Sequence, residues 1–149
     1  MGYPTRNGDM NATLTRHGYN MREPVPERRH TWRQKVRIVD SNSGAHEFYV
    51  EFGEYEDGRL AEVWIVANKV GSFARGILDS LGRSVSLALQ SGTSPHDMAE
   101  QLRSQDYPPQ GTVDAPGSAV TECTSVADYI GREIQSSYGA DGRRLGTEV

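Results

Sequence analysis

The first half of the chain alternates hydrophobic and polar positions with a period of two. This alternation in residues 32–40 and 46–54 predicts two half-buried strands. The nearly continuous apolar run at 60–67 predicts a third strand that is central or covered on both faces. Turn residues lie between the strands, SNSG at 41–44 and Asp-Gly at 57–58. We therefore expect an antiparallel meander of three strands.

From residue 72 the hydrophobic spacing becomes that of a helix, and it predicts one long helix over 72–90. Gly76 and Gly82 lie inside this helix, where each costs about 1 kcal/mol relative to alanine. Such a cost suggests that the sheet or a partner chain packs closely there. The predicted buried stripe is Phe73, Ile77, Leu81, Val85, Ala88 and Leu89, and the predicted polar face is Arg75, Asp79, Arg83, Ser86 and Gln90.

Two shorter helices are predicted nearer the C-terminus. Ser94-Pro95 begins a helix over about 95–103, because proline is favoured at the first helical position. Ser125 and Asp128 have the spacing of a capping box and begin a helix over about 126–137. The proline- and glycine-containing stretch 106–120 is predicted to be a loop. Strands followed by helices indicate an α+β fold, a three-stranded antiparallel meander packed against one long helix with two shorter C-terminal helices.

Composition places the packed part in the middle of the chain. A length of 149 residues suits one domain, but the mean hydropathy of -0.64 is low. Residues 1–26 and 139–149 have little to bury and are expected to be a flexible N-terminal segment and a flexible C-terminal tail. The α+β domain then occupies 27–138. The edges of so small a sheet, with the two helix glycines, suggest a homo-oligomer.

Charge and hydropathy narrow the classes of partner and compartment. The net charge of -4 argues against non-specific DNA binding, which needs a broad positive face. We find no apolar leader and no stretch long enough to span a bilayer, so a cytoplasmic location is expected.

The junction between the third strand and the long helix collects groups that suit an anion. A helix N-terminus exposes unpaired N–H groups and carries partial positive charge. Gly71 would let a phosphate approach the backbone, Ser72 could donate its hydroxyl, and Lys69 and Arg75 would add positive charge. The alternative is that Ser72 only caps the helix while the two basic side chains are solvated.

Three further groups favour structural interpretations. The basic residues Arg28, Arg29, Arg33, Lys35 and Arg37 could follow a nucleic-acid backbone with Trp32 as a stacking platform, but cross-strand pairing with glutamates 47, 51, 54 and 56 is favoured. Cys123 precedes the last helix without a nearby histidine and is expected to be a packed thiol. The four histidines have no metal-ligand spacing, so no metal site is predicted.

Several spaced stretches resemble one known family, the TSCPD domain at the C-terminus of cobalamin-dependent (class II) ribonucleotide reductases. They keep the family's order along the chain. The TSCPD string itself is absent, and the nearest sequence is TECTS at 121–125. The stretches that carry the resemblance are MREPVPERR (21–29), GEYEDGRLAEVWI (53–65), KVGSFARGILDSLGRSVSLALQSG (69–92) and SVADYI (125–130).

The resemblance implies nucleotide-related ancestry without the reductase reaction. The reductase barrel, its reducing cysteines and its cobalamin site have no counterpart in these residues, and one thiol cannot run a dithiol–disulfide cycle. We therefore expect no enzyme activity and no cofactor.

The leading hypothesis is a module that binds a nucleotide or another phosphate-bearing ligand at Lys69, Gly71, Ser72 and Arg75. The resemblance also suggests a stand-alone phage protein that sequesters a signalling nucleotide in the host cytoplasm. The alternative is an accessory subunit that docks on a ribonucleotide reductase or replication complex.

Overall fold

The computed structural model describes residues 15–16, 19–20, 22–67 and 72–146. It confirms the α+β class, and the predicted strands and helices begin and end within two residues of their expected bounds. The elements are β1 (Thr15–Arg16), β2 (Tyr19–Asn20), β3 (Thr31–Asp40), β4 (Gly44–Glu54), β5 (Leu60–Val66), α1 (Ser72–Gln90), α2 (Pro95–Leu102), β6 (Gly111–Asp114), β7 (Glu122–Cys123) and α3 (Val126–Ser137).

The main sheet has five antiparallel strands in the order β5-β4-β3-β6-β7, so the prediction of three strands was too few. The meander β3–β4–β5 is present as predicted. β6 comes from the stretch that was predicted to be a loop, and it pairs with β3, with Val113 opposite Ile38. A four-residue strand shows little alternation of its own. Pairing with a long neighbouring strand and burial of Val113 therefore override the local loop propensity.

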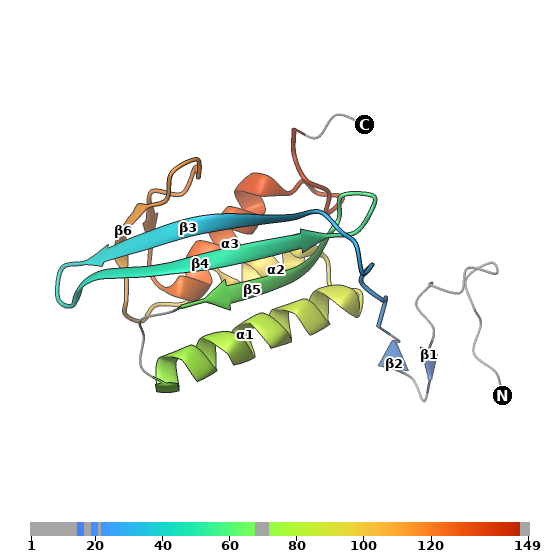
Figure 1. Cartoon of the computed structure of the whole chain (residues 1–149), viewed down its shortest axis with the longest axis horizontal. Coiled ribbons are helices and arrows are strands. Elements are labelled where there is room, and N and C mark those ends of the chain that lie inside the picture. Colours follow the sequence, from blue (N-terminus) through green and yellow to red (C-terminus); the bar gives the residue numbers. More distant parts are fainter. Residues whose placement is uncertain (1–14, 17–18, 21, 68–71, 147–149) are drawn as a thin grey trace.

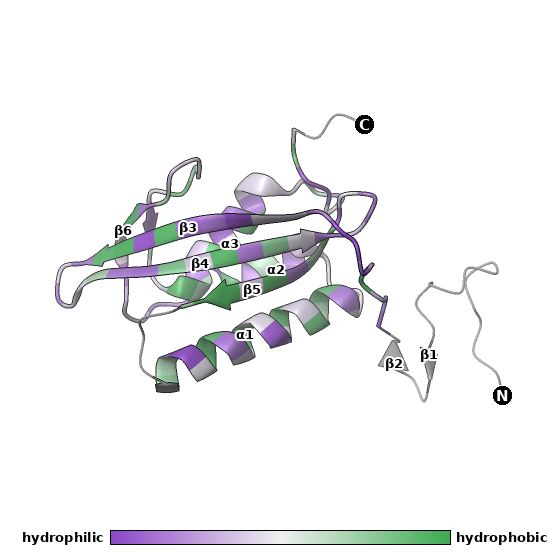
Figure 2. Cartoon of the chain, viewed as in Figure 1, coloured by the Kyte–Doolittle hydropathy of each residue, from purple (hydrophilic) through white to green (hydrophobic). Residues whose placement is uncertain are grey.

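The sheet has one covered face and one open face. Helices α2 and α3 lie behind it in the view of Figure 1. Hydrophobic and hydrophilic residues alternate along β3 and β4 in Figure 2, and the inward-facing Val36, Ile38, Val50 and Phe52 are fully buried. Phe48 meets Tyr129 of α3 edge to face, with ring centroids 6.3 Å apart. No helix in the described ranges is both long and apolar enough to cross a membrane.

Helix α1 runs along the free edge of β5 (Figure 1). Its orientation corrects the predicted faces, because Phe73 and Ile77 are exposed whereas Ser86 and Gln90 are buried. The physical reason is the unpaired backbone of an edge strand, which needs hydrogen-bond partners. Ser86 Oγ accepts from the amide of Val63 at 2.9 Å and lies 3.0 Å from the carbonyl oxygen, to which it can also donate. Gln90 donates to the carbonyl of Ala61 at 3.1 Å.

The two glycines of α1 have different surroundings. A Cβ on Gly82 would lie 3.1 Å from the carbonyl oxygen of Val63, so this glycine lets the helix approach β5 closely. A Cβ on Gly76 would meet nothing within 4 Å. The sheet therefore explains Gly82, whereas Gly76 has no packing reason within the described part of this chain.

Residues that follow α3 fold back onto the β4–β5 hairpin. The amide of Leu60 donates to the carbonyl of Gly142, and the amide of Arg144 donates to the carbonyl of Gly58. Buried Glu54 anchors the same region, because it accepts from the hydroxyl of Tyr138 at 2.6 Å. Burial, and next the carboxylate of Glu54, raise the pKa of Tyr138. Part of the segment assigned to the tail thus packs on the domain.

Asp128 joins three segments at the start of α3. Its amide donates to the side chain of the N-cap Ser125, as the capping-box spacing predicted. Its fully buried carboxylate accepts from the amides of Ser104 and Thr124 and from Nε of Arg132, at 2.8, 3.0 and 2.7 Å. Burial acts to raise the pKa of Asp128, but these three donors outweigh burial and hold the pKa below its usual value.

We predict that Gly76→Ala raises the free energy of unfolding by about 0.5–1 kcal/mol, because alanine is the better helix former and its methyl group has open space. Urea denaturation of the purified chain measures this change. A lower stability would mean that this face of α1 is already in close contact with another surface.

We predict that Asp128→Asn lowers the free energy of unfolding at pH 7 by about 2–3 kcal/mol, because charge-assisted hydrogen bonds to buried donors are weakened. A depressed carboxyl pKa contributes stability above the unfolded-state pKa of about 4, and this contribution is lost as the pH falls through the folded-state value. The difference between wild type and variant should therefore shrink at pH 3. An equal difference at both pH values would contradict the assignment.

Candidate functional site

The predicted anion corner is only partly visible. Lys69 and Gly71 lie outside the described residues, as does the side chain of Ser72. Helix α1 begins at Ser72, and Arg75 is exposed in its first turn, which contains no acidic residue. These features suit an anion, and Arg75 is the one predicted residue whose side chain the structure describes. The corner stays a prediction.

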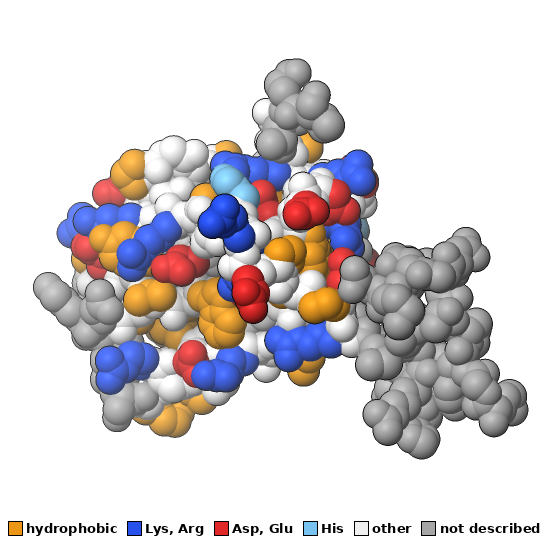
Figure 3. Space-filling model, turned by 45° about the vertical axis from the view of Figure 1, so that its right-hand side comes forward, with side chains coloured by type: hydrophobic (Ala, Val, Ile, Leu, Met, Phe, Trp, Pro, Cys, Tyr) orange, Lys and Arg blue, Asp and Glu red, His pale blue; other side chains and the backbone are white. Residues whose placement is uncertain are grey.

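The outer face of α1 carries three large exposed apolar side chains. The exposed fractions of Phe73, Ile77 and Leu87 are 82%, 55% and 49%. They lie on one stripe of the helix, opposite the face that packs on β5, with exposed Ser80 and Ser84 between them. In Figure 3, hydrophobic and charged side chains mix along the lower edge of the molecule, where α1 runs in Figure 1. We call this stripe the outer face of α1.

Two basic residues of β3, Arg33 and Lys35, are paired with glutamates across the strands, as the structural interpretation predicted for them. Lys35 contacts Glu47 at 3.1 Å and Arg33 contacts Glu51 at 3.6 Å on the open face of the sheet. Trp32 stacks on Phe52, with centroids 4.3 Å apart, and donates to the hydroxyl of Tyr138. Phe52 thus already covers a face of the Trp32 ring, which argues against Trp32 as a platform on which nucleic-acid bases stack.

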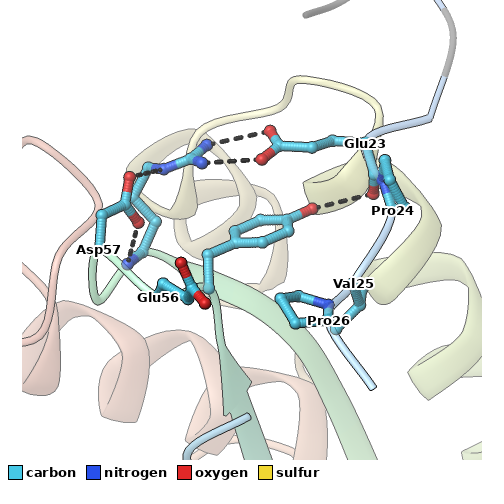
Figure 4. A pocket seen from close by; sticks show the side chains of 8 residues that line it. Glu23, Pro24, Val25, Pro26, Glu56 and Asp57 are labelled. Carbon is cyan, nitrogen blue, oxygen red and sulfur yellow. Dashed lines mark hydrogen bonds and ion pairs between the residues drawn. The ribbon is translucent and has the colours of Figure 1, made fainter. Parts of the chain in front are cut away.

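A hollow of about 420 Å³ lies between the segment Glu23–Pro26 and the turn after β4 (Figure 4). Arg59 donates to both carboxylate oxygens of Glu23 at 3.2 and 2.9 Å and to Asp57 at 2.7 Å. Burial, and next the charge of Glu23, raise the pKa of Tyr55 to about 12. Three carboxylates (Glu23, Glu56 and Asp57) against one guanidinium give the lining a formal charge of -2. This hollow disfavours anions, and its contacts fasten the N-terminal segment to the hairpin.

Cys123 is a packed thiol, as predicted. Its side chain is buried in β7, and burial raises the pKa of the thiol to about 11. It is therefore protonated at neutral pH and a poor nucleophile. Among the described residues, no three His, Cys, Asp or Glu side chains gather where they could hold a metal ion.

Comparison with known proteins relates most of the chain to one family. The TSCPD domain model matches residues 17–138. The chain is 34% identical over 117 residues to a vitamin B12-dependent ribonucleotide reductase of Bradyrhizobium diazoefficiens and 32% identical over 117 residues to that of Agrobacterium fabrum. It is 32% identical over 111 residues to that of Rhodopirellula baltica. No solved structure matches the chain.

The match covers most of this chain but little of the relatives. It spans 78% of the chain and 9% of the reductases of B. diazoefficiens and A. fabrum, and 74% and 10% for R. baltica. The expected relation to the reductase's TSCPD region is therefore confirmed. The chain belongs to the TSCPD domain family.

Proposed function

We propose that this protein is a non-catalytic interaction module that docks on a ribonucleotide reductase through the outer face of α1. The observation that carries the proposal is the exposure of Phe73, Ile77 and Leu87 on a helix whose other face is occupied by β5. Exposed apolar side chains gathered on one face are typical of surfaces that bind a protein partner. Apolar anchors spaced along one helix suit a groove on that partner.

The choice of a reductase as the proposed partner is supported by the relatives. The region that matches this chain makes up about a tenth of each reductase, so it is joined there to a much longer polypeptide. An apolar helix face on such a domain can be buried against the rest of that polypeptide. The same face on this chain would be buried by binding a reductase in trans. Gly76 and the two serines would let a partner helix approach closely.

The state of the thiol supports a role without catalysis. Ribonucleotide reduction consumes two electrons, which thiol chemistry supplies from a pair of cysteines. The chain has one cysteine, and its thiol is buried and hard to ionise. The proposed role is therefore to hold or position a partner and not to reduce a substrate.

Nucleotide or phosphate binding at the N-terminus of α1 is the second candidate. Its specific support is a first turn without acidic residues and with exposed Arg75, where a helix terminus favours an anion. A phage protein that sequesters a signalling nucleotide would use such a site. This candidate requires Lys69 and Gly71 to join Arg75 around the ligand.

For docking, we predict that the double substitution Phe73→Asp with Ile77→Asp weakens binding to the reductase by about 30-fold or more, the effect of losing one interface hot spot. Surface plasmon resonance would use an intact vitamin B12-dependent reductase from the cell in which this chain is made. Leu145→Asp is the matched control, because Leu145 is 56% exposed and its amide donates to the carbonyl of Ser137 at the end of α3, not to α1; it should bind like wild type.

Two results would contradict docking on the reductase. One is equal binding by the double variant and wild type. The other is a wild-type homodimer in light scattering that the double variant converts to a monomer, because a second copy of the chain would then cover the outer face of α1.

For the anion corner, we predict that Lys69→Ala with Arg75→Ala abolishes nucleotide binding at this site while costing little stability, because exposed Arg75 has little packing to lose. Isothermal titration with ATP and thermal unfolding measure the two effects. Arg83→Ala, which removes an exposed arginine of the same helix, is the control. If the double variant retains the parent's affinity, the corner is only a helix cap.

A further inference from the structure

A second hollow, of about 390 Å³, opens between the end of α2, α3 and the chain before β7. Two arginines line it, Arg103 after α2 and Arg132 on α3, together with the polar side chains of Thr121, Gln135 and Ser136. Glu122 is the one acidic residue of this lining, so the lining has a formal charge of +1. Its volume lies in the range of small-molecule sites.

Arg132 is fixed in direction by a buried partner. Its Nε donates to Asp128 at 2.7 Å, and the carboxylate of Asp128 is itself held by the amides of Ser104 and Thr124. Asp128 offsets the charge of Arg132 but takes only one of its five N–H donors. The guanidinium is thus oriented beside the hollow with donors to spare.

Arg103 has no carboxylate partner in the described part of the chain. Its Nη1 donates to Gln135 at 2.8 Å, and its buried Nε has no hydrogen-bond partner there. Gly131 explains how the side chain reaches this place, because a Cβ on Gly131 would lie 2.8 Å from Cγ of Arg103. The aliphatic stem therefore passes directly over α3. A buried guanidinium nitrogen without an acceptor is unusual, because it costs free energy. An acceptor bound in the hollow would offset that cost after a small rotation of the guanidinium.

The opposite wall is also held in place. Ser118, at the start of the segment that leads to β7, donates to the buried carboxylate of Glu133 at 2.6 Å. The same carboxylate accepts from the hydroxyl of Tyr129 at 2.9 Å. These bonds tie the loop before Thr121 to α3, so both sides of the hollow are fixed before any ligand binds.

A third hollow, of about 370 Å³, continues from the second. It shares Thr121, Glu122 and Arg132 with its neighbour and extends to Gly111 and Thr112 of β6. A ligand larger than a single anion can therefore lie along both, with Arg132 between them. Polar residues dominate this path, which suits a sugar or another hydroxyl-bearing group better than an apolar one.

We propose that the Arg103–Arg132 hollow binds a small molecule bearing a phosphate monoester or diphosphate. The phosphate oxygens accept from the two guanidiniums, whose forked donors match them, and the rest of the ligand extends toward Thr112. This site is separate from the anion corner of α1 and does not depend on docking by the outer face of α1. It differs from both proposed functions because its ligand is held by Arg103 and Arg132, which neither of them uses.

Isothermal titration of the whole chain with pyrophosphate, ADP and adenosine tests the site. We expect ADP and pyrophosphate to bind and neutral adenosine to bind at least tenfold more weakly. Arg103→Gln and Arg132→Gln should each weaken ADP binding about tenfold or more, because each removes charge-assisted hydrogen bonds. Arg83→Gln is the control, since it removes an arginine outside the hollow that is paired with Asp79; it should leave the affinity unchanged.

A second measurement keeps the test independent of variant folding. In amide NMR spectra of the unaltered chain, ADP should shift signals of Thr121, Glu122, Gln135 and Ser136. Shifts confined to residues 69–75 would overturn this site and support the corner of α1 instead. Absence of ADP binding, equal affinity for ADP and adenosine, or a folded Arg103→Gln variant with wild-type affinity would overturn it as well. None of these outcomes bears on reductase docking.

Discussion

The hydrogen bonds between Ser86 and the backbone of Val63 determine how α1 lies on the sheet. β5 is an edge strand, and its outward N–H and C=O groups would otherwise face solvent or another chain. Ser86 and Gln90 satisfy three of these groups from a helix that lies close to the strand at Gly82. Because the polar side of α1 thereby faces inward at its C-terminal half, Phe73 and Ile77 are turned outward. The outer face of α1 is therefore exposed because the opposite face of the helix satisfies the backbone groups at the edge of β5.

Sequence periodicity located the elements well but could not choose the buried face of α1. Apolar residues occur on two sides of this helix, so the pattern alone allows either side to be buried. The choice depends on which strand is at the edge, and that follows from pairing among distant segments. The same limit explains β6 and β7, because the few residues of β6 form a strand by pairing with β3, and those of β7 form one by pairing with β6. Long strands, helix starts and the Ser125–Asp128 cap rest on local chemistry and were predictable.

Some candidate binding residues could likewise be predicted from the sequence, whereas others are brought together only by the fold. The corner at Lys69–Arg75 was visible in the sequence because its groups are contiguous, and the glutamate partners of Arg33 and Lys35 followed from strand alternation. Arg103 and Arg132 are far apart in sequence and match no motif. Gly131 and Asp128 bring them together, and neither residue signals this role by itself. Membership of the TSCPD family relates the chain to ribonucleotide reductases, and the proposed docking and binding roles rest on its own side chains.

Amide hydrogen exchange of Val63 in the native chain tests the central claim most directly. If Ser86 seals the edge of β5, this amide should exchange as slowly as that of Val50 in the interior strand β4, although its strand has no neighbour on that side. Fast exchange, like that of an open strand edge, would contradict the account. It would mean that α1 does not present Ser86 to the sheet, and that Phe73 and Ile77 need not face outward.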